Sequence, residues 1–345
     1  MSTQPSQVGI TTREALEKFG RNWPSRTIAG WLVEKYPSVF SGFESAYSAV
    51  RYYRGAIGKK NRRKKVESIG LLRPHQEAHA QEIPLPESLA DNSNWDAVQI
   101  EFKRALVIQD VHIPYHDSKA VTLALDEGKR KGVDCIIING DLCDFYAISS
   151  WDKDPTARDF DSEIQSCRLF LEHLRDRFPK ARIVFKEGNH EERIWRFMWR
   201  KSPELYSLKD GQGKKLLNLR SLMDADNYGV EVVAEKRPIR CGDHLHLLHG
   251  HEFRTPFTNP VNPARGLYLR AKCNAFCGDL HQSSNHVETG LTHTVSCWSG
   301  GCLCDLHPPY SPLNKWNLGF ALVNLSKGQW DLDNKKIIGG QVVSA

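Results

Sequence analysis

Five short polar motifs lie between residues 110 and 281, and each follows an apolar, strand-like stretch. They are Asp110-Val-His112, Gly140-Asp141-Leu-Cys-Asp144, Gly188-Asn189-His190-Glu191, His249-Gly250-His251 and Gly278-Asp279-Leu-His281. Each motif is weak alone, but their number and order make chance a poor explanation. Carboxylates, imidazoles and an amide oxygen suit Mn²⁺, Fe or Zn²⁺, and an aspartate between two such sets can bridge two ions. The residue types therefore predict a dinuclear metal centre that activates water for hydrolysis.

A sheet with parallel strands is needed to bring these motifs together. Strand-like stretches over 104–109, 133–138 and 182–186 alternate with amphipathic helical stretches over 118–131 and 162–177. This βαβαβ order predicts an α/β body, and α/β proteins form their sites at the carboxyl ends of such strands. Later strand-like stretches have no helix between them, so we expect the second half to be richer in β-structure.

In this order the motifs resemble those of the calcineurin-like metallophosphoesterases, over about residues 103–325. The resemblance implies a four-layer α/β/β/α sandwich of two mixed sheets around two divalent metal ions. It implies that the first ion is held by Asp110, His112 and His281, that Asp141 bridges, and that Asn189 and His249 hold the second. It also implies hydrolysis of phosphate esters by metal-activated hydroxide, with His190 protonating the leaving group and Asp144 orienting that histidine.

One motif departs from the family pattern, which usually reads Gly-His-x-His where this chain has Gly278-Asp279-Leu-His281. Aspartate can ligate through oxygen and makes the second site harder, which favours Mn²⁺ over Zn²⁺ and leaves Mg²⁺ and Fe open. We therefore include Asp279 among the candidate ligands. The alternative is that Asp279 does not touch the metal and that the second ion binds weakly.

The residues after Asp144 bear on the substrate. Phosphoprotein phosphatases of this superfamily usually carry Asp-Arg-Gly after the bridging aspartate, with the arginine gripping phosphate, whereas Asp144 is followed here by Phe145-Tyr146. A phosphoprotein substrate is therefore not favoured. Candidates for contacting substrate instead are Arg193, His251 and Arg254. Trp195 and Trp199 are expected to pack at the core or its rim rather than to stack bases.

The charge of the chain is concentrated at its N-terminus. Residues 1–65 hold 13 Lys and Arg against 4 Asp and Glu, whereas the whole chain has a net charge of +6. Helical patterns to Lys18 with Thr11 or Thr12 as the N-cap, from Ser25 as a second N-cap, and over about 43–54 predict a small all-α module. A helix-turn-helix-like DNA reader fits this pattern, with candidate DNA contacts at Arg51, Arg54, Lys59, Lys60, Arg62 and Arg63. A solvated basic face, or a small interaction or oligomerisation bundle, remains the alternative.

Composition sets the remaining boundaries. Residues 66–99 are rich in Glu, Gln, Pro and Ala and are expected to form a linker, with the phosphoesterase domain over 100–345. No apolar run reaches the roughly 18 residues of a membrane span, and the first 20 residues lack the apolar core of a secretory signal. Nine cysteines without disulfide-type spacing predict reduced thiols. We therefore expect a cytoplasmic protein that has no membrane partner.

These features together favour a nuclease-like phosphodiesterase that acts on nucleic acid, with DNA as the first choice. A basic helical module followed by a phosphoesterase also looks like proteins encoded by bacteriophages and prophages, so we expect a bacterial or phage-infected cell. Two alternatives stay open. One is a phosphomonoesterase or small-molecule phosphodiesterase that the basic module merely localises. The other is a DNA-binding protein with a degenerate esterase body, for which the Asp279 departure is the sole support.

Overall fold

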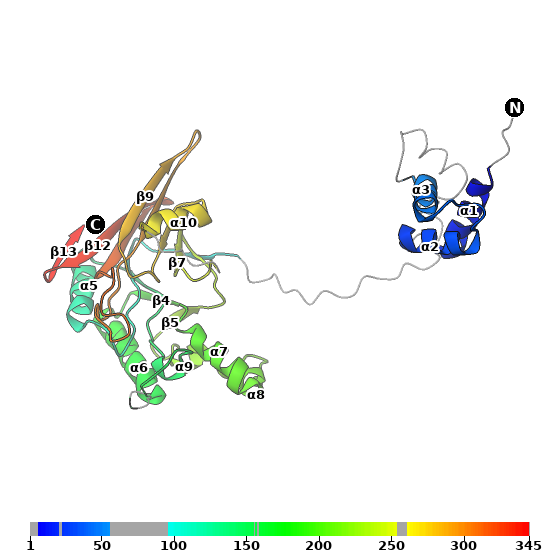
Figure 1. Ribbon diagram of the computed structural model, residues 1–345. Coiled ribbons are helices and arrows are strands. Elements are labelled where there is room, and N and C mark those ends of the chain that lie inside the picture. The colour runs from blue at the N-terminus through cyan, green and yellow to red at the C-terminus, as the bar shows by residue number, and fades with distance from the viewer. Residues whose placement is uncertain are drawn as a thin grey trace. The chain divides into compact units, whose positions relative to one another are not determined.

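The computed structural model describes residues 6–20, 23–55, 96–154, 156, 159–253 and 261–344. The chain divides into two compact units, Met1–Leu89 and Ala90–Ala345, which are treated separately below (Figure 1). None of the helices within these described ranges is long and apolar enough to cross a membrane. The nine cysteines are all free, as the sequence predicts.

The N-terminal unit is a three-helix module of α1 (Gln7–Phe19), α2 (Ser25–Lys35) and α3 (Phe43–Tyr53). Its core is small and is formed by Ala15, Ile28, Ala29, Leu32, Phe40, Ala46, Ala49 and Val50. The predicted caps are wrong. Helix α1 begins earlier because the Ser6 hydroxyl accepts a hydrogen bond from the Gly9 amide, 3.3 Å away. Thr12 lies inside the helix and donates to the Val8 carbonyl instead.

The second predicted cap, Ser25, serves a different purpose. Pro24 occupies the N-cap position of α2, and the Ser25 hydroxyl accepts a hydrogen bond from the Arg54 guanidinium at 3.0 Å. Arg54 also donates to the Gly20 carbonyl, so this candidate DNA contact links the start of α2 to the end of α3. Arg51 is exposed. The other candidate DNA contacts, Lys59, Lys60, Arg62 and Arg63, lie outside the described residues.

The second unit contains two mixed sheets. The seven-stranded sheet has the order β13-β12-β11-β2-β3-β4-β5, with β2 to β5 parallel. Its strands are β2 (Arg104–Ile108), β3 (Cys135–Asn139), β4 (Arg182–Lys186), β5 (Val230–Val233), β11 (Gly319–Ser326), β12 (Gln329–Ile338) and β13 (Gln341–Ser344). The six-stranded sheet has the order β1-β6-β7-β8-β10-β9. Its strands are β1 (Val98–Ile100), β6 (Ile239–Cys241), β7 (Leu245–Leu248), β8 (Ala275–Cys277), β9 (Ser284–Thr289) and β10 (Thr294–Ser299).

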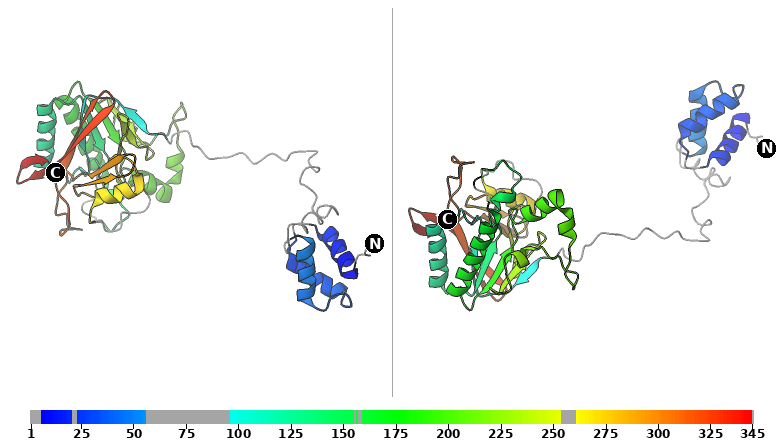
Figure 2. Two further views of the ribbon diagram at one scale, coloured as in Figure 1. Left: turned by 90° about the horizontal axis from the view of Figure 1, so that it is seen from above. Right: turned by 90° about the horizontal axis from the view of Figure 1, so that it is seen from below.

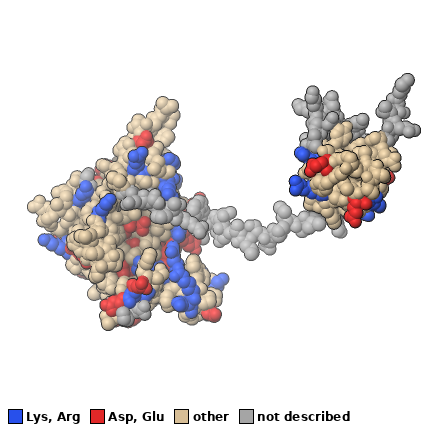
Figure 3. All heavy atoms as spheres, viewed as in Figure 1, with Lys and Arg blue, Asp and Glu red and all other residues tan. Residues whose placement is uncertain are grey.

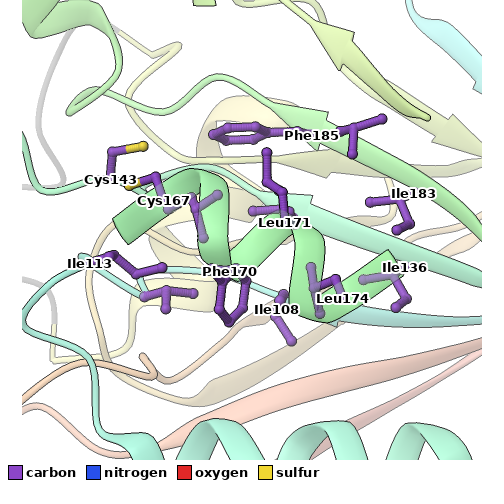
Figure 4. Packing of buried hydrophobic residues seen from close by; sticks show 14 of the residues in the cluster. Ile108, Ile113, Ile136, Cys143, Cys167, Phe170, Leu171, Leu174, Ile183 and Phe185 are labelled. Atoms are coloured by element: carbon purple, nitrogen blue, oxygen red, sulfur yellow. The ribbon is translucent and has the colours of Figure 1, made fainter. Parts of the chain in front are cut away.

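Successive side chains of the central strands point to opposite faces of the seven-stranded sheet, and both faces are buried. Ile108, Ile138 and Phe185 pack with residues of α5 (Ser118–Lys131) and α6 (Phe160–Arg177), as Figure 4 shows for α6. The intervening residues, such as Val107 and Ile137, pack against the second sheet. Helix α10 (Pro263–Ala271) covers the other face of that sheet. The order of layers is therefore helix, sheet, sheet, helix, which confirms the predicted sandwich (Figure 2).

The remaining elements follow the strands that carry the motifs. They are the 3₁₀ turn η1 (Tyr146–Ile148), α7 (Glu192–Lys201), α8 (Pro203–Ser207) and α9 (Leu219–Leu222).

The start of the body differs from the predicted boundary at residue 100. Strand β1 begins at Val98 and pairs in parallel with β6, so two residues assigned to the 66–99 linker belong to a sheet. Ile100 is fully buried at the end of this strand. Three residues are too few to show a period-two pattern, which is why the sequence did not indicate the strand. Residues 66–95 lie outside the described part of the chain.

The two units are expected to unfold separately, because each has its own apolar core. Leu32→Ala should remove about 2–5 kcal/mol from the module, which is enough to unfold a core of this size. Leu171→Ala in α6 should instead lower the transition of the body, because Leu171 is fully buried there. Differential scanning calorimetry of the full chain measures both transitions. A single transition lowered equally by both substitutions would contradict the separation.

Candidate active site

The polar motifs converge at the carboxyl edge of the seven-stranded sheet and the neighbouring ends of β7 and β8. Asp110, Asp141 and Gly188 follow the parallel strands β2, β3 and β4, and His249 directly follows β7. The candidate ligands Asp110, His112, Asp141, His249 and His281 are buried, and Asn189 and Asp279 are half-buried. Strand and loop geometry therefore gathers every residue for which the sequence predicts a metal-ligand role.

The backbone turns at these residues to aim their side chains inward. Asp110, His112, Asp141, Asp279 and His281 all have φ between 51° and 64°. Residues other than glycine rarely adopt this region, and each such residue costs of order 1 kcal/mol unless its surroundings hold it there. Backbone hydrogen bonds supply that support: the amides of residues 111 and 112 both donate to the Asp141 carbonyl, at 2.9 and 3.0 Å.

Position 188 requires glycine because the Asp141 carboxylate lies close to its Cα, and not because of its backbone angles. A Cβ at this position would collide with the Asp141 carboxylate. The glycine of the Gly188-Asn189-His190 motif thus leaves room for the carboxylate that lies at the centre of the site.

The histidines present their Nε2 atoms to a common space. His112 donates from Nδ1 to the Asp144 carboxylate at 3.1 Å, and His249 donates from Nδ1 to the Asn139 carbonyl at 2.8 Å. In its neutral form each of these rings therefore keeps a lone pair on Nε2 that points inward. The Nε2 atoms of His112 and His281 are 3.1 Å apart. Two imidazole nitrogens at this separation need a proton or a cation between them, which fits the donor set of a metal centre.

Asp141 lies between two groups of donors. Its Oδ2 atom is 3.8 Å from His112 Nε2 and 3.2 Å from His249 Nε2. On the first side, Asp110 Oδ1 is 3.4 Å from His281 Nε2. On the second side, His249 Nε2 is 2.9 Å from Asn189 Oδ1 and 3.7 Å from Asp279 Oδ1. The ligand atoms of Asp110, His112 and Asp141 form one compact group, and those of Asp141, His249 and Asp279 form another. Both groups share Asp141, as a bridging ligand requires.

The electrostatics of the site favour a bound cation. Burial lowers the pKa of His281, but the neighbouring Asp110 carboxylate outweighs burial and raises the pKa to about 9. The pKa of His249 is likewise raised well above its usual value against the effect of burial, mainly by Asp141. The pKa of the half-buried Asp279 is raised by burial and by the nearby carboxylates of Asp141 and Asp110. The carboxylates thus create a negative potential that draws protons here and would draw divalent ions when these are present.

His190 and Asp144 lie together at one side of this centre. His190 Nδ1 is 2.8 Å from the Asp144 carbonyl and 3.2 Å from its carboxylate. The Arg193 guanidinium approaches from the other side, 2.8 Å from His190 Nε2 and 2.7 Å from the Asp144 carbonyl. Burial raises the pKa of Asp144, but hydrogen bonds from His112 and His190 outweigh it and hold the pKa far below its usual value. Asp144 therefore stays ionised and orients two histidines, whereas the sequence predicted one.

The comparisons with known proteins agree with this geometry. Residues 103–273 match the family described as Calcineurin-like phosphoesterase. The Gene 54 protein of Mycobacterium phage L5 is 31% identical over 253 residues, which span 69% of this chain and 95% of the phage protein. The chain belongs to the calcineurin-like phosphoesterase family. Membership supports a metal-dependent hydrolase that acts on phosphate esters. The similarity to the Gene 54 protein confirms the predicted link to phage proteins.

Two further similarities cover a comparable share of the chain. The Gene 54 protein of Mycobacterium phage D29 is 30% identical over 253 residues, again covering 69% of this chain and 95% of that protein. Among solved structures, Vacuolar Protein Sorting 29 from Cryptosporidium parvum aligns over 71% of this chain and 97% of its own, with 16% identity and a TM-score of 0.39.

The structure describes two of the three candidate substrate contacts of this phosphoesterase. His251 is half-buried beside His249, with ring centroids 5.3 Å apart, and its Nε2 atom is 3.0 Å from the Glu192 carboxylate. This contact ties His251 to the start of α7. Arg254 lies outside the described residues. Arg193 is the predicted cation that does reach the site.

Three residues near the site escaped the sequence prediction as site residues. Glu191 is fully buried and accepts hydrogen bonds from the amides of Asp141, Cys143 and Gly188, at 2.8–3.0 Å. It joins the loops after β3 and β4, and its place in the third motif was the available signal. Cys304 Sγ lies 3.9 Å from His281 Nδ1, and the Trp316 ring centroid lies 4.2 Å from that of His281. Their loop is held at the site by hydrogen bonds between residues far apart in the sequence, such as that from the Leu303 amide to the Asp110 carbonyl. The spacing of residues within the loop does not predict such contacts.

The pKa of Glu163 in α6 gives a test of how burial and the charge of Asp144 act on a neighbouring carboxyl group. Glu163 is 4% exposed; Oε1 accepts from the Tyr146 amide at 3.0 Å, and Oε2 has no partner among the described residues. Burial, and then the Asp144 charge, raise its pKa to about 7. The folded state therefore holds a proton that the unfolded chain releases near pH 4.5, and stability should fall as pH rises from about 4.5 to 7.

Glu163→Gln removes this ionisation and keeps an amide oxygen for the Tyr146 amide. We expect it to stabilise the body by about 1–3 kcal/mol at pH 7.5 and to change stability little at pH 4.5. Urea denaturation of metal-free protein at both pH values measures the difference. An equal change at the two pH values would show that Glu163 is not the titrating group.

Proposed function

We propose that this phosphoesterase is a dinuclear enzyme that hydrolyses phosphodiesters in nucleic acid. The observation that carries the dinuclear assignment is the position of Asp141, whose carboxylate lies within 3.8 Å of an imidazole nitrogen of each donor group. The proposed ligands of the first ion are Asp110, His112 and His281, and those of the second are Asn189, His249 and Asp279. Divalent ions held there supply a Lewis acid for the phosphoryl oxygens and a source of hydroxide near neutral pH.

The chain's own residues would handle the leaving group. Burial lowers the pKa of His190, but the carboxylates of Asp141 and Asp144 outweigh burial and raise it, so the ring is prepared to hold a proton. With Nδ1 held by Asp144, Nε2 is the atom that would carry the transferable proton, and in this geometry it accepts from the Arg193 guanidinium. A substrate phosphate would then attract the Arg193 guanidinium, which at present lies 2.8 Å from that nitrogen. Arg193 thereby neutralises phosphate charge and frees Nε2 for donation.

The case for nucleic acid rests on charge. The N-terminal module region, residues 1–65, carries 13 basic and 4 acidic residues. Lys and Arg on phosphate release counterions, which gives affinity that does not depend on sequence. DNA is the favoured partner, and the similarity to phage proteins fits a role in the cytoplasm of an infected bacterium. A phosphomonoesterase localised by the module would share the metal centre but not the preference for diesters.

Hydrolysis of bis-p-nitrophenyl phosphate and p-nitrophenyl phosphate in Mn²⁺ separates these two functions. We expect a higher kcat/KM for the diester, no turnover after chelation, and losses of about 10²–10⁴ in kcat for His190→Ala and Asp141→Asn. His173→Ala is the matched control, because that histidine is exposed on α6. Turnover of the monoester alone would replace the diesterase with the phosphomonoesterase.

Asp279→His tests whether the half-buried aspartate ligates the second ion. A nitrogen donor in place of oxygen should raise the affinity for Zn²⁺ relative to Mn²⁺ by about tenfold or more. Equilibrium dialysis with elemental analysis gives both the affinities and the number of ions per chain. Two tightly bound ions with an unchanged Zn²⁺/Mn²⁺ preference would remove Asp279 from the ligand set.

A further inference from the structure

Helix α7 begins directly after the third metal-site motif and has one buried and one exposed side. Ile194 and Met198, four residues apart, are buried against the body, and Trp195 packs partly on the same core, which confirms the expectation for that tryptophan. The other side carries large and basic side chains in place of the small polar ones usual on a solvated helix. We call this side the α7 surface; it consists of Arg196, Phe197, Trp199, Arg200 and Lys201.

Two aromatic rings on the α7 surface face solvent. Phe197 is 40% exposed and Trp199 is 56% exposed. The Trp199 ring meets Tyr206 of α8 edge to face, with centroids 5.5 Å apart, so one contact holds the ring while much of it stays open. The expected rim packing of Trp199 is thus present but incomplete. Exposed aromatic faces grouped with cations are a feature of binding surfaces rather than of plain solvated helices.

The surroundings of the α7 surface are basic although the body is not. Residues 192–218 contain seven Lys and Arg against three Asp and Glu, whereas residues 66–345 carry more acidic than basic residues. In Figure 3, Lys and Arg atoms gather on the side of the body where Figure 1 places α7. Arg196 is paired with Glu192 at 2.8 Å. Arg200 and Lys201 form no ion pair with the described residues and remain available to an anionic partner.

The α7 surface continues from the catalytic side of the metal site. Arg193, Arg196 and Arg200 follow each other at helical spacing, on one side of α7. The first of these contacts His190 Nε2 and the Asp144 carbonyl. The rise from Arg193 to Arg200 is about 10 Å. A chain of phosphates with one group at the metal centre would therefore meet further cations along α7.

We infer that the α7 surface binds single-stranded nucleic acid and leads the strand to the metal centre. The inference rests on the proposed function and specifies the form of its substrate. Phosphates account for the cations, and unpaired bases account for the aromatic rings, because only an unpaired base offers its face for stacking. A duplex buries those faces and would use the cations alone. An acidic protein segment would likewise leave the exposed rings without a stacking partner.

The test uses the full chain in Mn²⁺ with a 20-nucleotide single strand and the corresponding duplex. Arg200→Glu/Lys201→Glu and, separately, Trp199→Ala should each lower kcat/KM for the single strand about tenfold relative to bis-p-nitrophenyl phosphate. Trp199→Phe should restore much of the loss, because it keeps a ring. The matched control is Lys129→Glu/Lys180→Glu, which makes the same change in charge at exposed ends of α5 and of the loop after α6.

Ultraviolet crosslinking of oligothymidylate, followed by peptide mapping, shows which residues contact the strand and does not depend on catalysis. We expect crosslinks at residues 197–206 that the Trp199→Ala variant loses. Crosslinks confined to other segments, or equal kcat/KM losses in the α7 variants and the control, would overturn the inference and leave the phosphodiesterase intact. A loss for duplex as large as for single strand with Trp199→Ala would also overturn it. Absence of any diester turnover would instead refute the proposed function, and crosslinking would still decide whether α7 binds the strand.

Discussion

The structure is organised around one electrostatic requirement: several buried carboxylates and imidazole lone pairs point at each other and need positive charge between them. Asp110 and Asp141 are almost fully buried, and the Nε2 atoms of His112 and His281 are only 3.1 Å apart. Such an arrangement is costly in a low-dielectric interior unless protons or metal ions compensate it. The Asp110 carboxylate raises the pKa of His281 to about 9 against the effect of burial, which reflects the same demand for positive charge.

The surrounding fold supplies rigidity where that repulsion would otherwise spread the loops apart. Parallel strands β2, β3 and β4 end at one edge, and Glu191 bonds the amides of the loops that follow two of them. Asp144 holds His112 and His190 through the same carboxylate, so a candidate metal ligand and the proposed leaving-group acid share one support. A substitution of Asp144 would therefore disturb His112 and His190 together, and its effect on the rate could not be assigned to either histidine alone.

Much of this was predictable because the signals are local. Strand-length apolar runs and the polar motifs after them identified an α/β body and the residues that gather at its edge. The resemblance of those motifs to a known family added the four layers of the sandwich. The first cap was wrong for a local reason, because Ser6 rather than Thr12 accepts the hydrogen bond at the start of α1. Other features depend on contacts between residues far apart in the sequence. His251 lies against Glu192, and the approach of Cys304 to His281 depends on pairing across almost two hundred residues. Sequence periodicity carries no information about such partners.

The left-handed backbone at Asp110, Asp141 and Asp279 has an evolutionary consequence. Glycine adopts this conformation without strain, and aspartate becomes glycine by a single nucleotide change. Drift in a body that had lost its chemistry would therefore move these positions toward glycine, with a gain in stability at each step. The chain carries a carboxylate at all three positions, at a cost to its fold. A strained carboxylate at each position is what a working metal site requires, and it weighs against a body that serves only as a scaffold for the N-terminal module.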